Sequence, residues 1–132
     1  MDIGKLSSQQ SLGAAAAGTA ASRLLYLLDS LSGMEFLVDT GASISLFPHN
    51  SRAPPSGPPL KSADGNSIPT WGNRWIPLQF SGKKFTWSFH LAGVDKAILG
   101  ADFLSANNLL IDVTAGILHS PDDLQLRPLP VN

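Results

Sequence analysis

The chain has 132 residues, of which 43% are hydrophobic and 14% charged, and its formal net charge is −1. This length leaves room for one hydrophobic core, so the sequence predicts a single small domain. The scattered basic residues exclude the dense positive surface that nucleic acids require, and the lack of cysteine excludes disulfides, a thiol nucleophile and cysteine-based zinc sites.

The first residues, 1–22, contain Ser, Gln, Gly and an alanine run without a bulky apolar face, which predicts a flexible low-complexity tail. A secretory signal peptide would need a basic start and a sustained leucine-rich core, which this segment lacks. No apolar run approaches the length needed to cross a bilayer. We therefore expect a chain that is not secreted and does not bind a membrane.

Two apolar segments, 23–28 and 34–38, flank Asp29–Gly33 and predict a β-hairpin. The second segment leads directly into Asp39-Thr40-Gly41. An apolar strand that runs into an ionisable group tends to bury it, and carboxylates with shifted pKa values cluster at sites of acid–base chemistry. Asp39 is therefore a candidate catalytic residue, although Asp and Gly are also ordinary turn residues.

Turn residues separate the next predicted strands. A proline-rich loop at 53–59 precedes the segment 63–72, whose Gly65-Asn66 turn predicts a second hairpin. Strands are then expected at 75–80 and 85–91, joined by a turn at 81–84. Aromatic residues alternate along the later strand and belong to the core, while Pro77 indicates an edge position or a bulge in the earlier one.

The C-terminal part begins with the apolar run Ala97–Leu99, which ends at Gly100 and can pack beside the strand that leads to Asp39. Helical spacing follows over 103–110, and Asp102 is expected to cap the start of this short helix in a structural role. A terminal hairpin is predicted at 111–119. Three prolines among polar residues make 121–132 a linker or tail.

Two motifs together resemble the signature pair of the retropepsins, the dimeric aspartic proteases of retroviruses and LTR retrotransposons. They are Leu37–Ser43 and Ile98-Leu99-Gly100. The segments 63–72, 85–89 and 98–113 resemble, in the same order, the flap, the following strand and the closing helix and hairpin of the gypsy-type retrotransposon protease. The resemblance covers about residues 23–120. It implies an all-β, single-lobe retropepsin-type acid protease barrel with one short C-terminal helix.

The number of catalytic motifs indicates the mechanism. The chain holds one Asp-Thr-Gly and no second Asp-Thr-Gly or Asp-Ser-Gly. Peptide hydrolysis without a metal or a covalent nucleophile needs one group to accept a proton from water and another to donate one to the carbonyl oxygen. A symmetric homodimer provides both by bringing two copies of Asp39 to its axis, where they share one proton. The sequence thus predicts an aspartic endopeptidase without cofactor or metal.

The residues after Asp39 have expected roles in this dyad. The resemblance implies that Thr40 forms a hydrogen bond to its counterpart across the axis. Gly41 lets the backbone come close to the carboxylates and donate its N–H group. Ala42 stands where many aspartic proteases carry serine, so a hydroxyl that would stabilise the ionised dyad is missing. We therefore expect a bell-shaped pH profile with an optimum at weakly acidic to neutral pH.

Strand periodicity places Leu37 on the face of Asp39 and Ile98 on the face of Gly100, so both are expected to border the scissile bond, although each is also readable as a core residue. In retropepsins the matching positions line apolar pockets, which implies extended polypeptide substrates with hydrophobic or aromatic residues at the cleavage point. Trp71 either seals the site or anchors the base of the flap. The other candidate substrate-binding residues are Ala42, Ser43 and Ile68.

Other chemistries lack their sequence patterns. The histidines at 49, 90 and 119 are isolated, and no nucleophile elbow or phosphate-binding loop is present. Two hypotheses remain. The first is an active homodimeric protease that processes its own polyprotein, located in the cytoplasm or within retroelement particles. The second is a decayed or domesticated copy that serves as a dimerisation or peptide-binding module. We favour the first because every position that the dyad needs is present, and the interface candidates are 23–27 and the terminal hairpin.

Overall fold

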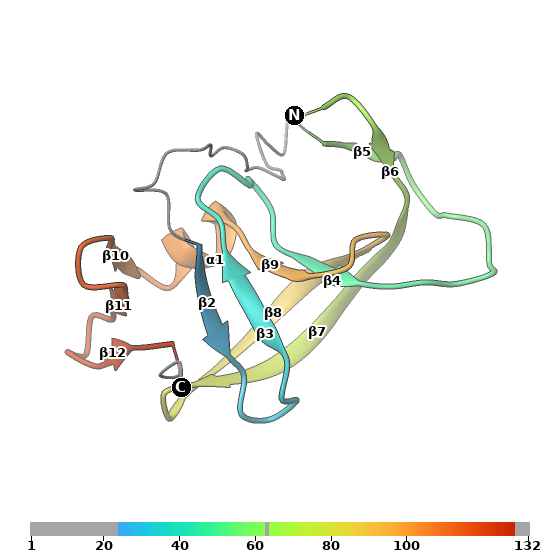
Figure 1. The fold of residues 1–132 in the computed structure, drawn as a ribbon. Coiled ribbons are helices and arrows are strands. Elements are labelled where there is room, and N and C mark those ends of the chain that lie inside the picture. The colour runs from blue at the N-terminus through green and yellow to red at the C-terminus, as the bar shows by residue number, and fades with distance from the viewer. Residues whose placement is uncertain (1–23, 63, 129–132) are drawn as a thin grey trace.

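The structure is a computed structural model that describes residues 24–62 and 64–128 (Figure 1). The tail expected at 1–22 lies outside the described residues. Strands dominate the described residues, and one short helix, α1 (Ala101–Ala106), lies between two of them in the chain, so the expected all-β class is confirmed. The strands are β2 (Leu25–Leu28), β3 (Glu35–Val38), β4 (Leu46–Pro48), β5 (Leu60–Lys61), β6 (Ser67–Ile68), β7 (Thr70–Phe80), β8 (Lys83–Ala92), β9 (Ala97–Leu99), β10 (Leu110–Asp112), β11 (Ile117–His119) and β12 (Gln125–Leu126). The described part of the chain holds no helix with the length and hydrophobicity needed to span a bilayer.

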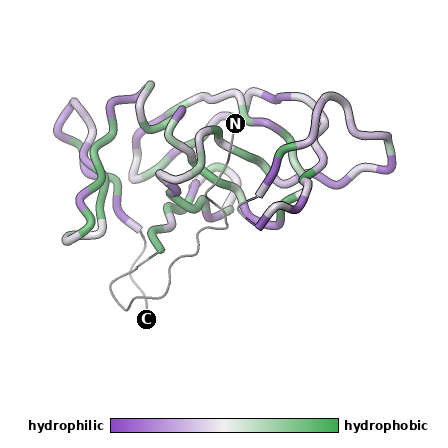
Figure 2. Tube along the Cα trace, turned by 90° about the horizontal axis from the view of Figure 1, so that it is seen from above, coloured by the Kyte–Doolittle hydropathy of each residue, from purple (hydrophilic) through white to green (hydrophobic). Residues whose placement is uncertain are grey.

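A six-stranded sheet with the order β2-β3-β9-β4-β8-β7 forms the centre of the molecule. Strands β3 and β9 are parallel neighbours, and Leu37 pairs with Ile98. The two motifs that are far apart in the sequence therefore lie side by side, as their apolar runs predicted. Hydrophobic stretches follow the central strands, whereas white and purple stretches occupy the projecting loops (Figure 2).

The predicted first hairpin is present, with β2 and β3 antiparallel. Its turn is organised by Asp29, whose side chain is fully buried. The carboxylate accepts hydrogen bonds from the N–H groups of Leu31 (3.2 Å) and Ser32 (3.1 Å). It also accepts one from the N–H of Gln79 in β7 at 2.8 Å. One buried acid thus ties this turn to the far edge of the sheet, and these bonds offset the cost of burying it.

The longest hairpin joins β7 to β8 and differs in detail from the sequence prediction. Strand β7 begins at Thr70, five residues earlier than expected, and it is an edge strand, as Pro77 indicated. The turn consists of Ser81 and Gly82 alone, with φ angles of 51° and 83°, and the following lysines belong to β8. A two-residue turn with positive φ at both positions matches the twist of paired strands.

Two hydrophobic clusters fill the interior. The larger contains Phe36, Phe80, Phe89 and Phe103, each fully buried, and these phenylalanines form a chain of ring contacts with Phe47, Phe85 and Trp87. This confirms that the alternating aromatics of β8 face the core. The smaller cluster consists of Ala42, Leu46, Ala92 and Ile98. It lies beneath the β5–β6 hairpin, whose Leu60 and Ile68 pack against it.

The C-terminal residues form a separate three-stranded sheet, β10-β11-β12 (Figure 1). The hairpin predicted at 111–119 is present as β10 and β11. The structure differs from the expected linker at 121–132, because β12 pairs with β11 and Leu126 is fully buried. The Lys83 ammonium lies 2.7 Å from the Asp122 carboxylate and holds the pKa of that carboxyl well below its usual range. The prolines flank β12 instead of interrupting it.

Candidate active site

Asp39 occupies the first position after β3. Its N–H donates to the carbonyl of Leu99 in β9 at 3.0 Å, so the loop that carries it starts from a fixed point on the neighbouring strand. Its Oδ1 accepts the N–H of Gly41 at 3.0 Å, and its backbone carbonyl accepts the N–H of Ala42 at 3.1 Å. The carboxylate is thus held in place by the turn that follows it.

The second carboxylate oxygen, Oδ2 of Asp39, is buried and has no hydrogen-bond partner among the described residues. Burial raises the pKa of the Asp39 carboxyl above its ordinary value of 3.8, and the N–H groups of Gly41 and Ala42 offset part of this effect. A carboxyl that protonates more readily than usual and keeps one oxygen unpaired suits proton exchange with a water or a second carboxyl.

Gly100 fixes the loop on its other side. A Cβ atom at this position would lie 2.7 Å from the carbonyl oxygen of Ile44 and 2.8 Å from that of Ala42. Any side chain would therefore push the backbone of the loop away from β9. The next residue, Ala101, donates its N–H to the carbonyl of Ala42 at 2.8 Å, which continues the contact.

Asp102 is structural, as predicted, and its Oδ1 accepts the Phe103 N–H in the first turn of α1 at 2.7 Å, but it is not the N-cap residue. Gly100 takes the N-cap position of α1, and Asp102 is the second helical residue. Its carboxylate accepts the Ser45 hydroxyl at 2.7 Å and the Ser45 N–H at 3.1 Å. The Ser45 hydroxyl oxygen in turn accepts the Gly100 N–H at 2.8 Å. This network locks the loop after Asp39 to α1, and it makes Ser45, which sequence reasoning did not single out, a positioning residue.

Of the expected dyad neighbours, Thr40 is exposed in the loop after β3. Gly41 provides the N–H that Asp39 accepts. The half-buried Leu37 lies outside both hydrophobic clusters, on the face of Asp39. Ile98 and Ala42 are both buried in the smaller cluster.

The structure brings three of the predicted substrate-binding residues together. Ala42 and Ile98 belong to the smaller cluster, and Ile68 of β6 packs against it from above. Ser43 is half-buried in the loop between them. Substrate contact by each of these residues stays a prediction.

A hairpin is present at the expected flap, but it is displaced from the predicted range 63–72. Strands β5 and β6 pair in antiparallel register from Leu60 to Ile68, and residues 70–72 already belong to β7. The tip of the hairpin is organised by Asp64, which accepts the backbone N–H and the side-chain amide of Asn66, each at 3.1 Å, and a short hydrogen bond from the Ser62 hydroxyl. These bonds, that of Ser62 first, lower the pKa of Asp64. The flap tip is therefore ordered by its own side chains.

Trp71 lies at the base of this flap. Its indole Nε1 donates to the carbonyl of Ala53 at 3.0 Å, and its ring centroid is 5.1 Å from that of His49. It also lines a recess of about 610 Å³ together with Ile68 and Val94. Of the two roles left open by the sequence, these contacts favour anchoring of the flap base, and contact with substrate stays a prediction.

Comparison with known proteins supports the fold at low sequence identity. No family model matches the sequence, and no curated protein matches it. Among solved structures, the chain is similar to the retroviral protease-like domain of Ddi1 from Leishmania major, with a TM-score of 0.61 and 19% identity over 84% of this chain and 98% of that chain. The EIAV protease complexed with the inhibitor HBY-793 matches with a TM-score of 0.49 and 17% identity, over 70% of this chain and 93% of that chain.

The first of these similarities defines the class of fold. Residues 24–62 and 64–128 form a single-lobe, retropepsin-like barrel with one small helix, and the fold expected from the two sequence motifs is confirmed. Within this fold, Asp39 directly follows β3, which pairs with β9, and Ala42 of the same loop belongs to the smaller cluster.

Proposed function

We propose that this chain is an aspartic-type endopeptidase that hydrolyses peptide bonds as a symmetric homodimer. The observation that supports this most directly is the half-buried Asp39, whose Oδ2 has no partner among the described residues and whose pKa is raised by burial. Such a group in the one Asp-Thr-Gly of the sequence is half of a two-carboxylate site.

In the proposed mechanism, two copies of Asp39 share one proton at the two-fold axis. The ionised carboxylate accepts a proton from a water molecule while the water oxygen attacks the carbonyl carbon of the peptide. The protonated carboxyl donates its proton to the carbonyl oxygen, which gives a neutral tetrahedral intermediate. The C–N bond then breaks as the dyad donates its proton to the amine nitrogen and accepts a proton from one hydroxyl of the intermediate. This hydroxyl oxygen becomes the carbonyl oxygen of the acid product, and the dyad returns to its singly protonated state.

We infer that the dimer forms through the C-terminal sheet and the start of β2. Strand β10 is one of the two edge strands of its sheet, and Leu110 in this strand and Val113 just after it are 69% and 72% exposed. Leu24, before β2, is 63% exposed. Exposed apolar side chains beside an unpaired strand edge favour association with a second copy. Thr40 would then meet its counterpart at the axis.

The proposed substrate is an extended polypeptide with hydrophobic or aromatic residues at the cleaved bond. Three apolar residues support this specificity: Leu37, which shares the strand face of Asp39, its strand partner Ile98, and Ile68, which packs against the cluster that contains Ile98. We further propose that the protein belongs to a gypsy-type retrotransposon, acts on the element's own polyprotein, and works in the cytoplasm or in retroelement particles.

The test is incubation of the protein with a peptide library, with and without a statine-type inhibitor, beside the Asp39→Asn variant. Cleavage that stops with the inhibitor and with the substitution supports the proposal, whereas cleavage by Asp39→Asn removes Asp39 from the mechanism. A dilution series measures activity and dimer fraction together, and both should fall in parallel.

The alternative function is a decayed or domesticated module for dimerisation or peptide binding. The short flap favours it, because β5 and β6 contain only two residues each. Peptides that bind but stay intact in the same library experiment would establish this alternative.

A further inference from the structure

The face of the central sheet that carries Asp39 continues along β3 to a charged recess. Alternate residues of a strand point to the same side, so Leu37 and Glu35 share the face of Asp39, while Phe36 points into the main core. The four residues from Asp39 to Glu35 span about 13 Å in an extended strand. Glu35 is therefore within reach of a peptide whose cleaved bond lies at Asp39.

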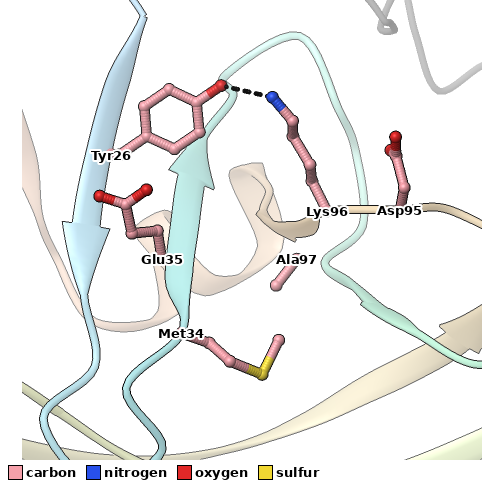
Figure 3. Close-up of a pocket in the computed structure, with 6 residues that line it drawn as sticks. All are labelled: Tyr26, Met34, Glu35, Asp95, Lys96 and Ala97. Atoms are coloured by element: carbon pink, nitrogen blue, oxygen red, sulfur yellow. Dashed lines mark hydrogen bonds between the residues drawn. The ribbon is translucent and has the colours of Figure 1, made fainter.

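The neighbouring strands supply the walls of this recess. Tyr26 of β2 pairs with Leu37, so its ring lies on the same face. Lys96 precedes Ile98 by two residues and reaches this face from the β9 side. Figure 3 shows the Tyr26 ring and Glu35 on one side of the recess, Lys96 and Ala97 on the other, and the Met34 thioether below. The recess has a volume of about 470 Å³ and is lined by Tyr26, Met34, Glu35, Asp95, Lys96 and Ala97.

In this recess the Lys96 ammonium has a hydrogen-bond partner, whereas the two carboxylates have none among the described residues. The Lys96 ammonium donates to the Tyr26 hydroxyl at 3.0 Å and lies 5.3 Å from the centroid of its ring. The bond to Tyr26 raises the pKa of Lys96, with smaller contributions from Asp95 and Glu35. Within residues 24–62 and 64–128, the Glu35 and Asp95 carboxylates accept no hydrogen bond and form no ion pair. Two unpaired carboxylates against one engaged ammonium leave the recess with a formal charge of −1.

We propose that this recess is an outer substrate subsite that selects a basic side chain, arginine or lysine, three or four residues from the scissile bond. The aliphatic stem of the substrate side chain packs on Tyr26 and Met34, and its cationic end reaches the Glu35 carboxylate, with Asp95 adding to the negative potential. This inference rests on the proposed function, because it deepens the specificity of the same site.

Tyr26 has a positioning role in this subsite. By holding the Lys96 ammonium, it keeps that charge from pairing with Glu35. Removal of the hydroxyl frees Lys96 to neutralise Glu35, so loss of the Tyr26 hydroxyl and loss of the Glu35 charge should both weaken the preference for a basic substrate side chain. Loss of the Lys96 charge should strengthen this preference.

The experiment uses the full chain and matched peptides that carry Arg, Gln or Glu at each of the second to fifth positions on either side of the cleaved bond. At one or two of these positions, we expect kcat/KM to fall from Arg to Gln to Glu by about two- to fivefold per step, as exposed charge pairs allow. The preference should shrink in 1 M salt. Glu35→Gln and Tyr26→Phe should reduce it, Lys96→Met should increase it, and the control Lys84→Met, at an exposed lysine of β8, should leave it unchanged.

A second measurement separates failure of the subsite from failure of the protease. The same peptides, labelled for fluorescence anisotropy, are titrated with the Asp39→Asn variant, which holds them intact. If peptides are cleaved and bound without a charge preference, the proposed subsite is wrong and the proposed peptidase function is retained. Charge-dependent binding without cleavage by the unmodified chain supports the subsite and overturns the protease. Absence of both cleavage and binding overturns both proposals.

Discussion

The hydroxyl oxygen of Ser45 lies 2.7 Å from Oδ1 of Asp102, although 57 residues separate them in the sequence. The same hydroxyl oxygen accepts the N–H of Gly100, so one buried serine connects the loop after Asp39 with the end of β9 and the start of α1. The geometry of the candidate catalytic loop depends on this connection.

Ser45→Ala tests this dependence. The substitution leaves the Gly100 N–H without its partner and removes one hydrogen bond from the Asp102 carboxylate, which keeps the bond from the Ser45 N–H. An unsatisfied buried polar group costs about 1–3 kcal/mol. We expect urea denaturation to show a loss of this size in the free energy of unfolding, together with a reduced kcat. Ser105→Ala, on the exposed side of α1, is the control and should change neither. An unchanged kcat and stability in Ser45→Ala would contradict the positioning role.

The pH dependence of stability tests the raised pKa of Asp39. Between 3.8, the ordinary value, and the higher pKa of the folded chain, the folded chain binds more protons than the unfolded chain. Stability from this group is therefore greatest at low pH and falls as the pH rises through that window. Asp39→Asn removes this loss, so its gain in unfolding free energy over the unmodified chain should be larger at pH 7 than at pH 3.5.

Acids whose pKa values are lowered, such as Asp64 and Asp112, make the folded chain more stable as the pH rises. They are present in both the unmodified chain and Asp39→Asn, so their contributions cancel in the difference between the two unfolding free energies. A gain that is equal at both pH values would mean that folding does not change the pKa of Asp39.

The activity itself should follow a bell-shaped pH profile with a weakly acidic to neutral optimum, measured as kcat/KM against pH. An enzyme that works best only in strong acid would contradict the argument from Ala42.

Val113→Asp tests the proposed dimer interface. Burying an aliphatic side chain contributes about 1.5–3 kcal/mol, and 1.4 kcal/mol corresponds to a factor of ten in affinity. We therefore expect the dimer dissociation constant in sedimentation equilibrium to rise at least about tenfold, with a parallel loss of activity at low protein concentration. Trp75→Ser, at a residue of β7 that is 68% exposed, is the matched control. Equal dimerisation of the two variants would place the interface elsewhere.

Trp71→Phe tests the anchoring of the flap. The change keeps an aromatic ring near His49 but removes the hydrogen bond to the Ala53 carbonyl. Loss of a hydrogen bond worth about 0.5–1.5 kcal/mol should speed amide exchange in the flap about two- to tenfold, for example at Ser62, and should raise KM more than it lowers kcat. Amide exchange in β10 and β11 should stay unchanged. A drop in kcat alone would instead indicate direct contact with the reacting groups.

The sequence predicted those parts of the structure that depend on local patterns. The hairpins, the alternation in β8 and the edge position of Pro77 follow from periodicity and turn residues, and the pairing of β3 with β9 follows from two apolar runs that end in tight turns. The Ser45–Asp102 contact was missed because serine and aspartate usually bond to nearby backbone, so Asp102 indicated a local helix cap. Strand β12 was missed because prolines on both sides of two paired residues outweighed the apolar Leu126.

The alignment of Leu37 with Ile98 has a consequence for how such a site could be lost. Successive side chains of a strand point to opposite sides, so sliding β3 by one residue against β9 would swap its two surfaces. Phe36 would then face water, and the Asp39 carboxylate would point into the larger hydrophobic cluster, where a peptide cannot reach it. A shift of one residue in the register of two short strands would thus be enough to remove Asp39 from its face of the sheet, even if every side chain is kept.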